Sequence, residues 1–272
     1  MSARLRQLAK ATEAIVEAGK YTASGGRTVD LAARIAAARS GTRLHGPGPV
    51  ACTVDATHAT VFEVTPEGST QAARRLVGEV REPVAVLNFA SARNPGGGFL
   101  NGAQAQEEAL CRASALYTCL REVPEFYEHH RAHRDAFYTD RVIHAPAVPV
   151  FRDDSGRLLE EPYDVGFLTS PAPNAGVIRR SRPDEADRIG PVLAARAERV
   201  LETAVAHGYR HLVLGAWGCG VFQNDPAQVA GAFHALLTGE GRFAGHFSRV
   251  VFGVLDRQGA TRAAFEHAFP AA

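Results

Sequence analysis

The sequence predicts an α/β fold, in which a mixed or largely parallel sheet carries helices on both faces and a helical extension precedes the sheet. Three observations support this prediction. From residue 50 onward, short apolar runs alternate with stretches of helical periodicity, and the connections are short. Before residue 40, two stretches show helical periodicity. The 272-residue chain has 46% hydrophobic and 22% charged residues, which is typical of a globular protein.

The N-terminal extension is expected to contain two helices. Residues 4–18 form the first, because their apolar side chains recur at helical spacing. Residues 28–39 form the second, with Thr28 as its N-cap and an apolar stripe made of Leu31, Ile35 and Ala38. The turn-rich segment GTRLHGPGP (41–49) then indicates a boundary. We therefore expect an extension over 1–45, packed on a main domain over 46–272.

The main domain is expected to alternate strands and helices. A proline-containing segment, 141–151, is predicted to be extended and to lie at a sheet edge or to be irregular. Asp225 and Pro226 are predicted to open a helix, with Asp225 as N-cap. The remaining strands are expected at 50–54, 60–64, 83–89, 164–170, 211–217 and 249–255, and the remaining helices at 69–78, 107–121, 184–207 and 259–268.

The charge pattern argues against a protein that coats nucleic acid in general. The chain has 30 Lys+Arg against 29 Asp+Glu, a formal net charge of +1, whereas such proteins are strongly basic. Residues 1–43 carry six Arg and two Lys against three acidic residues, a local charge of +5. This excess fits a solvated basic helix face, and it also fits contact with a polyanion.

The patterns of cysteine, histidine and hydropathy argue against several other classes of protein. The four cysteines lack CxxC spacing, so we expect reduced thiols in a cytoplasmic protein. No apolar run is long enough to span a membrane, and the charged N-terminus does not resemble a secretion signal. The HHxxH run at 129–133 reads as a polar helix end, since a zinc hydrolase of this kind would need HExxH. We therefore expect no metal and no cofactor.

Two glycine-rich loops each follow a predicted strand and precede a predicted helix. The first contains Gly96, Gly97 and Gly98, and the second contains Gly218 and Gly220. Glycine lets backbone N–H groups approach a ligand closely, and a following helix N-terminus favours an anion. Ligands of open α/β sheets bind where strands end. The two loops are therefore predicted to line one crevice that holds two adjacent phosphates.

A pair of glutamates lies just after the first loop, in the segment QEE (106–108). Acidic residues are common in the first turn of a helix, but two anions beside a phosphate loop would repel the ligand unless they take part in chemistry. Neighbouring carboxylates raise one of the two pKa values, which suits a general acid near neutral pH. The pattern points to cleavage of a bond close to a diphosphate, such as a glycosidic bond of a ribose.

These motifs resemble the poly(ADP-ribose) glycohydrolases of the microbial, short type. NPGGGFLNGAQAQEE (94–108) fits their GGG-(6–8 residues)-QEE signature, with seven residues between GGG and QEE. GAWGCGVFQNDP (215–226) is similar to their diphosphate loop, and LTSPAPN (168–174) is also similar to the family. The resemblance implies a macrodomain-like fold and a hydrolase that releases ADP-ribose from poly(ADP-ribose), trimming chain ends.

The resemblance also implies roles for individual residues. Glu108 would be the general acid and base, Glu107 would hold the hydroxyls of the same ribose, and Gln106 would support the loop. The glycine loop 96–98 would approach the distal ribose and diphosphate. The other implied binding residues are Asn88 at the distal ribose, Gly218, Cys219, Gly220 and Val221 at the diphosphate, Phe222 at the terminal ribose or adenine, and Asn174 in the pocket lining.

The wider context follows from the same resemblance. It implies a bacterial protein that reverses ADP-ribosylation in the DNA damage response, acts as a monomer and meets ADP-ribosylated proteins. Separately, Asp55 follows the first predicted strand, where it would accept a hydrogen bond from the adenine amino group or cap a turn.

Two other functions fit the same residues. The first is removal of single ADP-ribose units from protein or nucleic acid, which the QEE carboxylates do not exclude and which the basic N-terminal segment would favour for nucleic acid. The second is a non-catalytic ADP-ribose reader, in which only the glycine loops matter. Retention of both glutamates speaks against a reader, because carboxylates beside a diphosphate do not help binding.

Overall fold

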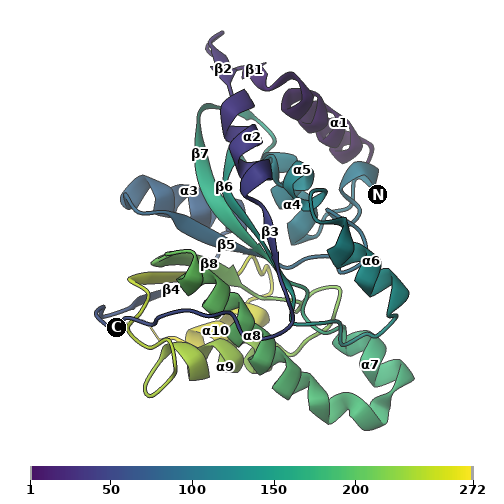
Figure 1. The fold of residues 1–272 in the computed structure, drawn as a ribbon, viewed down its shortest axis with the longest axis vertical. Coiled ribbons are helices and arrows are strands. Elements are labelled where there is room, and N and C mark those ends of the chain that lie inside the picture. The colour runs from purple at the N-terminus through teal and green to yellow at the C-terminus, as the bar shows by residue number, and fades with distance from the viewer. Residues whose placement is uncertain (1, 271–272) are drawn as a thin grey trace.

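The computed structural model describes residues 2–270 and contains a central sheet of seven strands in the order β3-β6-β7-β5-β8-β9-β4. The five strands β7, β5, β8, β9 and β4 run parallel to one another, whereas β6 pairs antiparallel with both β3 and β7. A separate two-stranded hairpin, β1-β2, lies in the N-terminal region (Figure 1). The predicted mixed sheet is therefore confirmed.

The elements follow one another along the chain with short connections. The strands are β1 (Lys20–Thr22), β2 (Thr28–Asp30), β3 (Arg43–His45), β4 (Val61–Thr65), β5 (Val84–Asn88), β6 (Val142–Arg152), β7 (Leu158–Thr169), β8 (His211–Gly215) and β9 (Arg249–Gly253). The helices are α1 (Ala3–Ala18), α2 (Ala32–Gly41), α3 (Ser69–Glu79), α4 (Gln106–Ala113), α5 (Leu116–Leu120), α6 (Pro124–Ala132), α7 (Ala175–Ser181), α8 (Ile189–Ala206), α9 (Pro226–Leu237) and α10 (Ala260–Ala268), with short 3-10 helices at Phe99–Asn101 and Pro183–Arg188.

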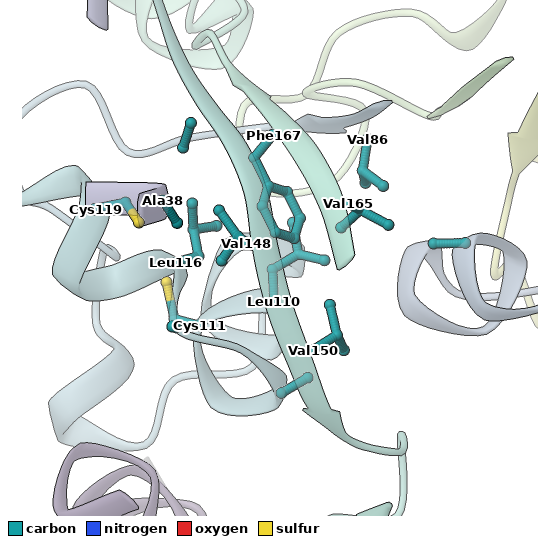
Figure 2. Close-up of a cluster of buried hydrophobic side chains, with 14 of the residues drawn as sticks. Ala38, Val86, Leu110, Cys111, Leu116, Cys119, Val148, Val150, Val165 and Phe167 are labelled. Carbon is teal, nitrogen blue, oxygen red and sulfur yellow. The ribbon is translucent and has the colours of Figure 1, made fainter. Parts of the chain in front are cut away.

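The sheet is buried on both faces, and the chain divides its helices between them in sequence order. Along β5, Val84 and Val86 face the core formed with helices α1 to α6, whereas Ala85 and Leu87 face the core formed with α7 to α10. This alternation follows from the two-residue period of a strand. Figure 2 shows part of the first core, where Leu110 and Cys111 of α4 and Leu116 of α5 lie close to β6 and β7.

The N-terminal region contributes more than helices to the fold. The predicted stripe of Leu31, Ile35 and Ala38 is buried, as expected. Thr28 is not a helix cap, however, because it lies in β2 and pairs with Thr22. The N-cap position is Leu31, which makes no side-chain capping bond, and the preceding Asp30 instead accepts a hydrogen bond from the N–H of Ala32 at 2.8 Å.

The predicted turn-rich break at 41–49 contains strand β3, which pairs antiparallel with β6 at one edge of the main sheet. The extension over 1–45 is thus joined to the main sheet by backbone hydrogen bonds. The division into 1–45 and 46–272 stays a prediction.

Three further expectations need correction. Residues 50–54 form no strand, because the backbone N–H of Val50 bonds to Glu202 of α8 at 2.8 Å and nearby apolar side chains pack against the second core. The helix expected at 107–121 breaks at Ser114, whose hydroxyl donates to the carbonyl of Leu110 at 2.7 Å and accepts from the N–H of Leu116 at 3.2 Å. The helix expected at 184–207 begins as a 3-10 turn and becomes α8 only at Ile189.

The proline-containing strand β6 lies inside the sheet, so its expected place at an edge is wrong. The expected irregularity is real. A register shift occurs between Ala145 and Val148, where Ala147 has a φ of 45°. Pro149 has no N–H, and its carbonyl accepts a hydrogen bond from Ala115 at 3.1 Å. A bulge therefore lets β6 tolerate its prolines.

Candidate active site

The two glycine loops leave neighbouring parallel strands. β5 ends at Asn88 and β8 ends at Gly215, and the two strands pair directly. A Cβ atom placed on Gly215 would lie 3.1 Å from the ring of Phe89, so the loop starts are in contact. The end of β7 lies on the other side of β5, where the N–H of Ser170 bonds to the carbonyl of Asn88 at 3.2 Å. The structure therefore brings both loops to one end of the sheet.

The first loop is shaped to the glutamates that follow it. Gly97 has a φ of +56°, and a Cβ atom on it would lie 2.5 Å from Oε1 of Glu108 and 3.3 Å from Oε2 of Glu107. Gly96 has a φ of +64°, and its Cβ would lie 2.8 Å from the ring of Tyr117. Glycine is thus required here both by conformation and by close approach to the glutamates.

Glu108 has one carboxylate oxygen fixed and one free. Its side chain is buried, and Oε1 accepts a hydrogen bond from the N–H of Gly98 at 2.8 Å. Its Oε2 is buried and has no hydrogen-bond partner within residues 2–270. A buried carboxylate oxygen without a partner is costly in a folded protein. It therefore marks a position where a ligand group or proton can be bound.

Glu107 is held more completely than Glu108. Its Oε1 accepts from the side-chain amide of Asn88 at 3.2 Å, and its Oε2 accepts from the N–H of Ser91 at 2.6 Å. Burial raises the pKa of Glu107 to about 8, and the nearby charge of Glu108 adds to the increase. One member of the pair thus has a raised pKa, as expected, but the main cause is burial, and the member is Glu107 rather than the expected acid Glu108.

Asn88 and Gln106 tie the strand end to the start of α4. Asn88 is fully buried, and its amide also donates to the hydroxyl of Thr169 at 3.1 Å. Gln106 accepts from the N–H of Phe89 at 2.9 Å and donates to the carbonyl of Leu87 at 2.8 Å. These contacts make Asn88 a support for Glu107, and its contact with a ribose stays a prediction.

The second loop is held by an asparagine that the sequence reasoning missed. Asn224 is buried, and its amide donates to the carbonyl of Pro173 at 2.8 Å and to that of Gly218 at 3.2 Å. Gly218 has a φ of +70°, and a Cβ on it would lie 2.5 Å from the Asn224 amide nitrogen. Gly220 has open space around its Cβ position within the described chain. The loop is therefore rigid at its base and open at its tip.

The tip of the second loop carries Cys219, Val221 and Phe222. Val221 is 77% exposed. Phe222 is half-buried, with its ring centroid 5.8 Å from that of Tyr138, and its carbonyl accepts from Gly176 at 2.9 Å. Burial raises the pKa of Cys219 to about 12, so its thiol is neutral at physiological pH. This region presents backbone and apolar groups rather than a reactive thiol.

Two predicted binding residues have structural contacts of their own. The side chain of Asn174 caps α7 by accepting from the N–H of Val177 at 3.1 Å. Asp55 lies beyond any strand, and its carboxylate pairs with Arg210 at 3.3 Å. The contacts of Asn174 and Asp55 explain these side chains without a ligand, and their binding roles stay predictions.

The basic N-terminal segment is partly neutralised inside the molecule. Arg34 pairs with Asp164 of β7 at 2.6 Å, and Arg39 donates to Glu122 at 2.6 Å. These contacts favour the structural interpretation of the local positive charge over contact with a polyanion.

Within residues 2–270, no group of three or more histidine, cysteine or acidic side chains is arranged to hold a metal ion. In the same range, no helix is both long enough and apolar enough to span a bilayer.

Comparison with known proteins relates this site to an enzyme family. Residues 9–153 match the model of the microbial-type PARG (poly(ADP-ribose) glycohydrolase) catalytic domain. A glutamate-to-alanine variant of poly(ADP-ribose) glycohydrolase from Thermomonospora curvata is 51% identical, with a TM-score of 0.92, over 98% of this chain and 100% of that chain. The Thermomonospora enzyme bound to the inhibitor ADP-HPD is also 51% identical, with a TM-score of 0.91, over 98% of this chain and 100% of that chain.

A second bacterial structure gives the same result. Poly(ADP-ribose) glycohydrolase from Deinococcus radiodurans in complex with ADP-ribose is 47% identical, with a TM-score of 0.80, over 87% of this chain and 97% of that chain. No curated protein sequence matches the chain. The sheet flanked by helices therefore has the macrodomain-like fold expected from the motifs. The match of more than half the chain to the family model, and the close similarity to two bacterial enzymes, show that the chain belongs to the microbial-type poly(ADP-ribose) glycohydrolase family.

Proposed function

We propose that this protein hydrolyses the ribose–ribose glycosidic bonds of poly(ADP-ribose) and releases ADP-ribose. Family membership supports the reaction type, and similar structures hold ADP-ribose or the inhibitor ADP-HPD. The observation that carries the proposal is Glu108, with Oε1 fixed by Gly98 and a buried Oε2 left without a partner in the described chain. One oxygen is thus fixed, and the other is free to hold the proton that a general acid transfers.

In the proposed reaction, Glu108 transfers its proton to the ribose oxygen of the leaving group as the bond from that oxygen to C1″ breaks. Positive charge develops on the ribose, as in other glycoside hydrolyses. Ionised Glu108 then removes a proton from a water molecule, whose oxygen bonds to C1″. The water proton restores the acid. Proton transfer of this kind contributes about 10²–10⁴-fold to a rate.

Glu107 is proposed to hold the hydroxyl groups of the same ribose. Because burial raises its pKa to about 8, Glu107 is largely protonated at pH 7. The pair then carries less negative charge beside a bound diphosphate. The contacts with Asn88 and Ser91 keep the Glu107 carboxyl group in place next to Glu108, so Glu107 positions the substrate while Glu108 transfers the proton.

The glycine loops are proposed to bind the rest of the ADP-ribose unit. Gly96, Gly97 and Gly98 approach the distal ribose, and backbone amides from Gly218 to Val221 bind the diphosphate. Phe222 packs on the terminal ribose or adenine. A loop braced by Asn224 would surround the end of a chain, which supports attack from the chain end.

The test is digestion of auto-modified, protein-attached poly(ADP-ribose) without added metal, with free ADP-ribose followed by chromatography. We expect release by the wild type, release by a Glu125→Gln control on the exposed surface of α6, and at least a 10²-fold loss in Glu108→Gln. Wild-type turnover by Glu108→Gln would refute the role of Glu108. Binding of ADP-ribose without release by any of these proteins would refute the glycohydrolase and favour a mono-ADP-ribosyl hydrolase or a reader.

The early products of the same digestion test the direction of attack. An enzyme that trims chain ends releases ADP-ribose monomers while the remaining polymer shortens gradually. Internal cleavage instead yields free oligomers at early times. Oligomers would therefore contradict end-directed attack without affecting the proposed reaction.

A further inference from the structure

A small cavity lies between α1, α4 and the turn that joins β6 to β7, and none of the described residues that we assign to the catalytic cleft lines it. Its volume is about 90 Å³, well above the roughly 10–15 Å³ that a single water molecule needs. Leu5 and Leu8 of α1 form its apolar side. Three arginines form its basic side, one from α1, one from α4 and one at the end of β6: Arg4, Arg112 and Arg152.

Each of these arginines already binds a neutral acceptor. Arg4 donates to the carbonyl of Ser155 at 2.8 Å, and Arg112 donates to the carbonyl of Ala103 at 2.6 Å. Arg152 donates to the hydroxyl of Thr12 at 3.1 Å and to the carbonyl of Gly156 at 2.9 Å. These contacts fix the guanidinium groups at the cavity wall, but they do not neutralise the charges.

Arg112 and Arg152 lie in unusual surroundings for a charged group. Arg152 is buried and Arg112 is half-buried, yet neither forms an ion pair with a carboxylate in the described chain. Burial lowers the pKa of both arginines, and Glu108, one turn earlier on α4, partly opposes this for Arg112. Buried charges in proteins are normally paired, because desolvating an unpaired charge is costly. The cavity therefore has an excess of positive charge.

The acidic residues of the cavity wall do not provide the missing partner. Asp153 pairs with Arg157 at 2.9 Å and accepts from the hydroxyl of Ser155 at 2.6 Å. Asp154 accepts from the hydroxyl of Thr70. Asp153 is thus paired with Arg157, whereas Thr70 leaves the negative charge of Asp154 in place, so the three arginines face one uncompensated carboxylate.

We propose that this cavity binds a phosphate-class oxyanion, at a site distinct from the catalytic cleft. Guanidinium groups bind phosphate oxygens through charge-assisted hydrogen bonds, and the volume suits one phosphate group rather than a nucleotide. The phosphate has two possible sources, which are free inorganic phosphate and a phosphate of the poly(ADP-ribose) chain outside the cleft.

The first experiment measures inorganic phosphate binding to the full-length protein by calorimetry, at constant ionic strength and with ADP-ribose saturating the cleft. Arg112→Gln and Arg4→Ala are expected to weaken binding about tenfold each, the effect of losing one charge-assisted hydrogen bond. Arg134→Ala removes an exposed arginine after α6 and serves as the control, with unchanged binding. Arg4 is exposed, so its variant keeps the test valid if Arg112→Gln fails to fold.

Two results would overturn the proposal. One is that the wild type binds no phosphate under these conditions. The other is that all variants bind it equally, in which case the arginines only clamp carbonyl groups. Because the readout does not depend on turnover, it stays interpretable even if the protein proves not to be a glycohydrolase.

A second experiment identifies the source of the phosphate. Binding of poly(ADP-ribose) is measured to Glu108→Gln protein with and without the Arg4→Ala change. Weaker polymer binding together with weaker phosphate binding supports a site for the polymer. Weaker phosphate binding alone supports a site for free phosphate.

Discussion

At the scale of the residue, glycine is required at position 97 by the carboxylate of Glu108 as well as by the turn. A methyl group on Gly97 would lie 2.5 Å from Oε1 of Glu108, closer than any normal contact, and the φ of +56° disfavours side chains as well. We predict that Gly97→Ala displaces Glu108 and lowers kcat about 10²-fold, since a shift of about 1 Å has such effects.

The matched control for Gly97→Ala is Gly231→Ala. Gly231 lies in α9, where its Cβ position is free of contacts within the described chain, so this change should leave kcat unaltered and slightly stabilise the helix. Digestion assays on both variants decide the question. Wild-type turnover by Gly97→Ala would mean that the glutamate tolerates displacement.

The raised pKa of Glu107 predicts that the stability of the fold depends on pH. Its pKa rises from the ordinary value of 4.5 to about 8 in the folded state because of burial. Between these values, the unfolded chain loses the proton while the folded chain keeps it, so stability falls as pH rises from about 4.5 to about 8, by up to about 1.4 kcal/mol per pH unit. Glu107→Gln cannot lose a proton and should remove this contribution.

Urea unfolding at pH 5.5 and pH 7.5 measures this difference. The wild type should lose more unfolding free energy between the two pH values than Glu107→Gln does. An equal loss in both proteins would mean that Glu107 titrates in the folded state as it does in the unfolded state.

At the scale of the element, the helix cap at Asp225 was predictable because its signal is local. The carboxylate of Asp225 accepts from the N–H of Ala227 at 2.9 Å, and Pro226 occupies the first turn of α9. We predict that Asp225→Ala lowers the free energy of unfolding by about 1 kcal/mol. The control Asp184→Ala changes an exposed aspartate of a 3-10 turn, and chemical denaturation compares the two. Equal effects would argue against the cap.

Other elements were not predictable from local patterns, because distant contacts decide them. Residues 50–54 have the composition of a strand, but a glutamate of α8 satisfies the backbone N–H of Val50. Ser114 breaks a continuous helical pattern through its own hydroxyl contacts and a bridge to Val150 of β6. In the site, the glycine loops and the glutamates were evident as motifs. Asn224 was missed, because a single asparagine in a loop carries no signal until its carbonyl partners are known.

At the scale of the whole molecule, the question is whether the N-terminal region is an extension or an integral part of the fold. Strand β3 pairs with β6, and side chains from α1 and α2 are buried in the same core as those of α4 and α5. The hydroxyl of Thr12 in α1 donates to the carbonyl of Arg112 at 2.8 Å. The match to the family model also runs without interruption from residue 9 to residue 153, across the proposed boundary at residue 45.

We therefore predict that a chain starting at residue 46 does not fold. Removing residues 1–45 would expose the edge of β6 to solvent and uncover part of the first core. Exposed strand edges promote aggregation. Calorimetry of the intact chain should show a single cooperative transition, whereas the shortened chain should show none. Two separate transitions in the intact chain, or a soluble and active shortened chain, would instead establish the extension as a dispensable unit. The contacts of β3 argue for a single transition in the intact chain and none in the shortened chain, because a strand that completes the main sheet cannot unfold without exposing its neighbour.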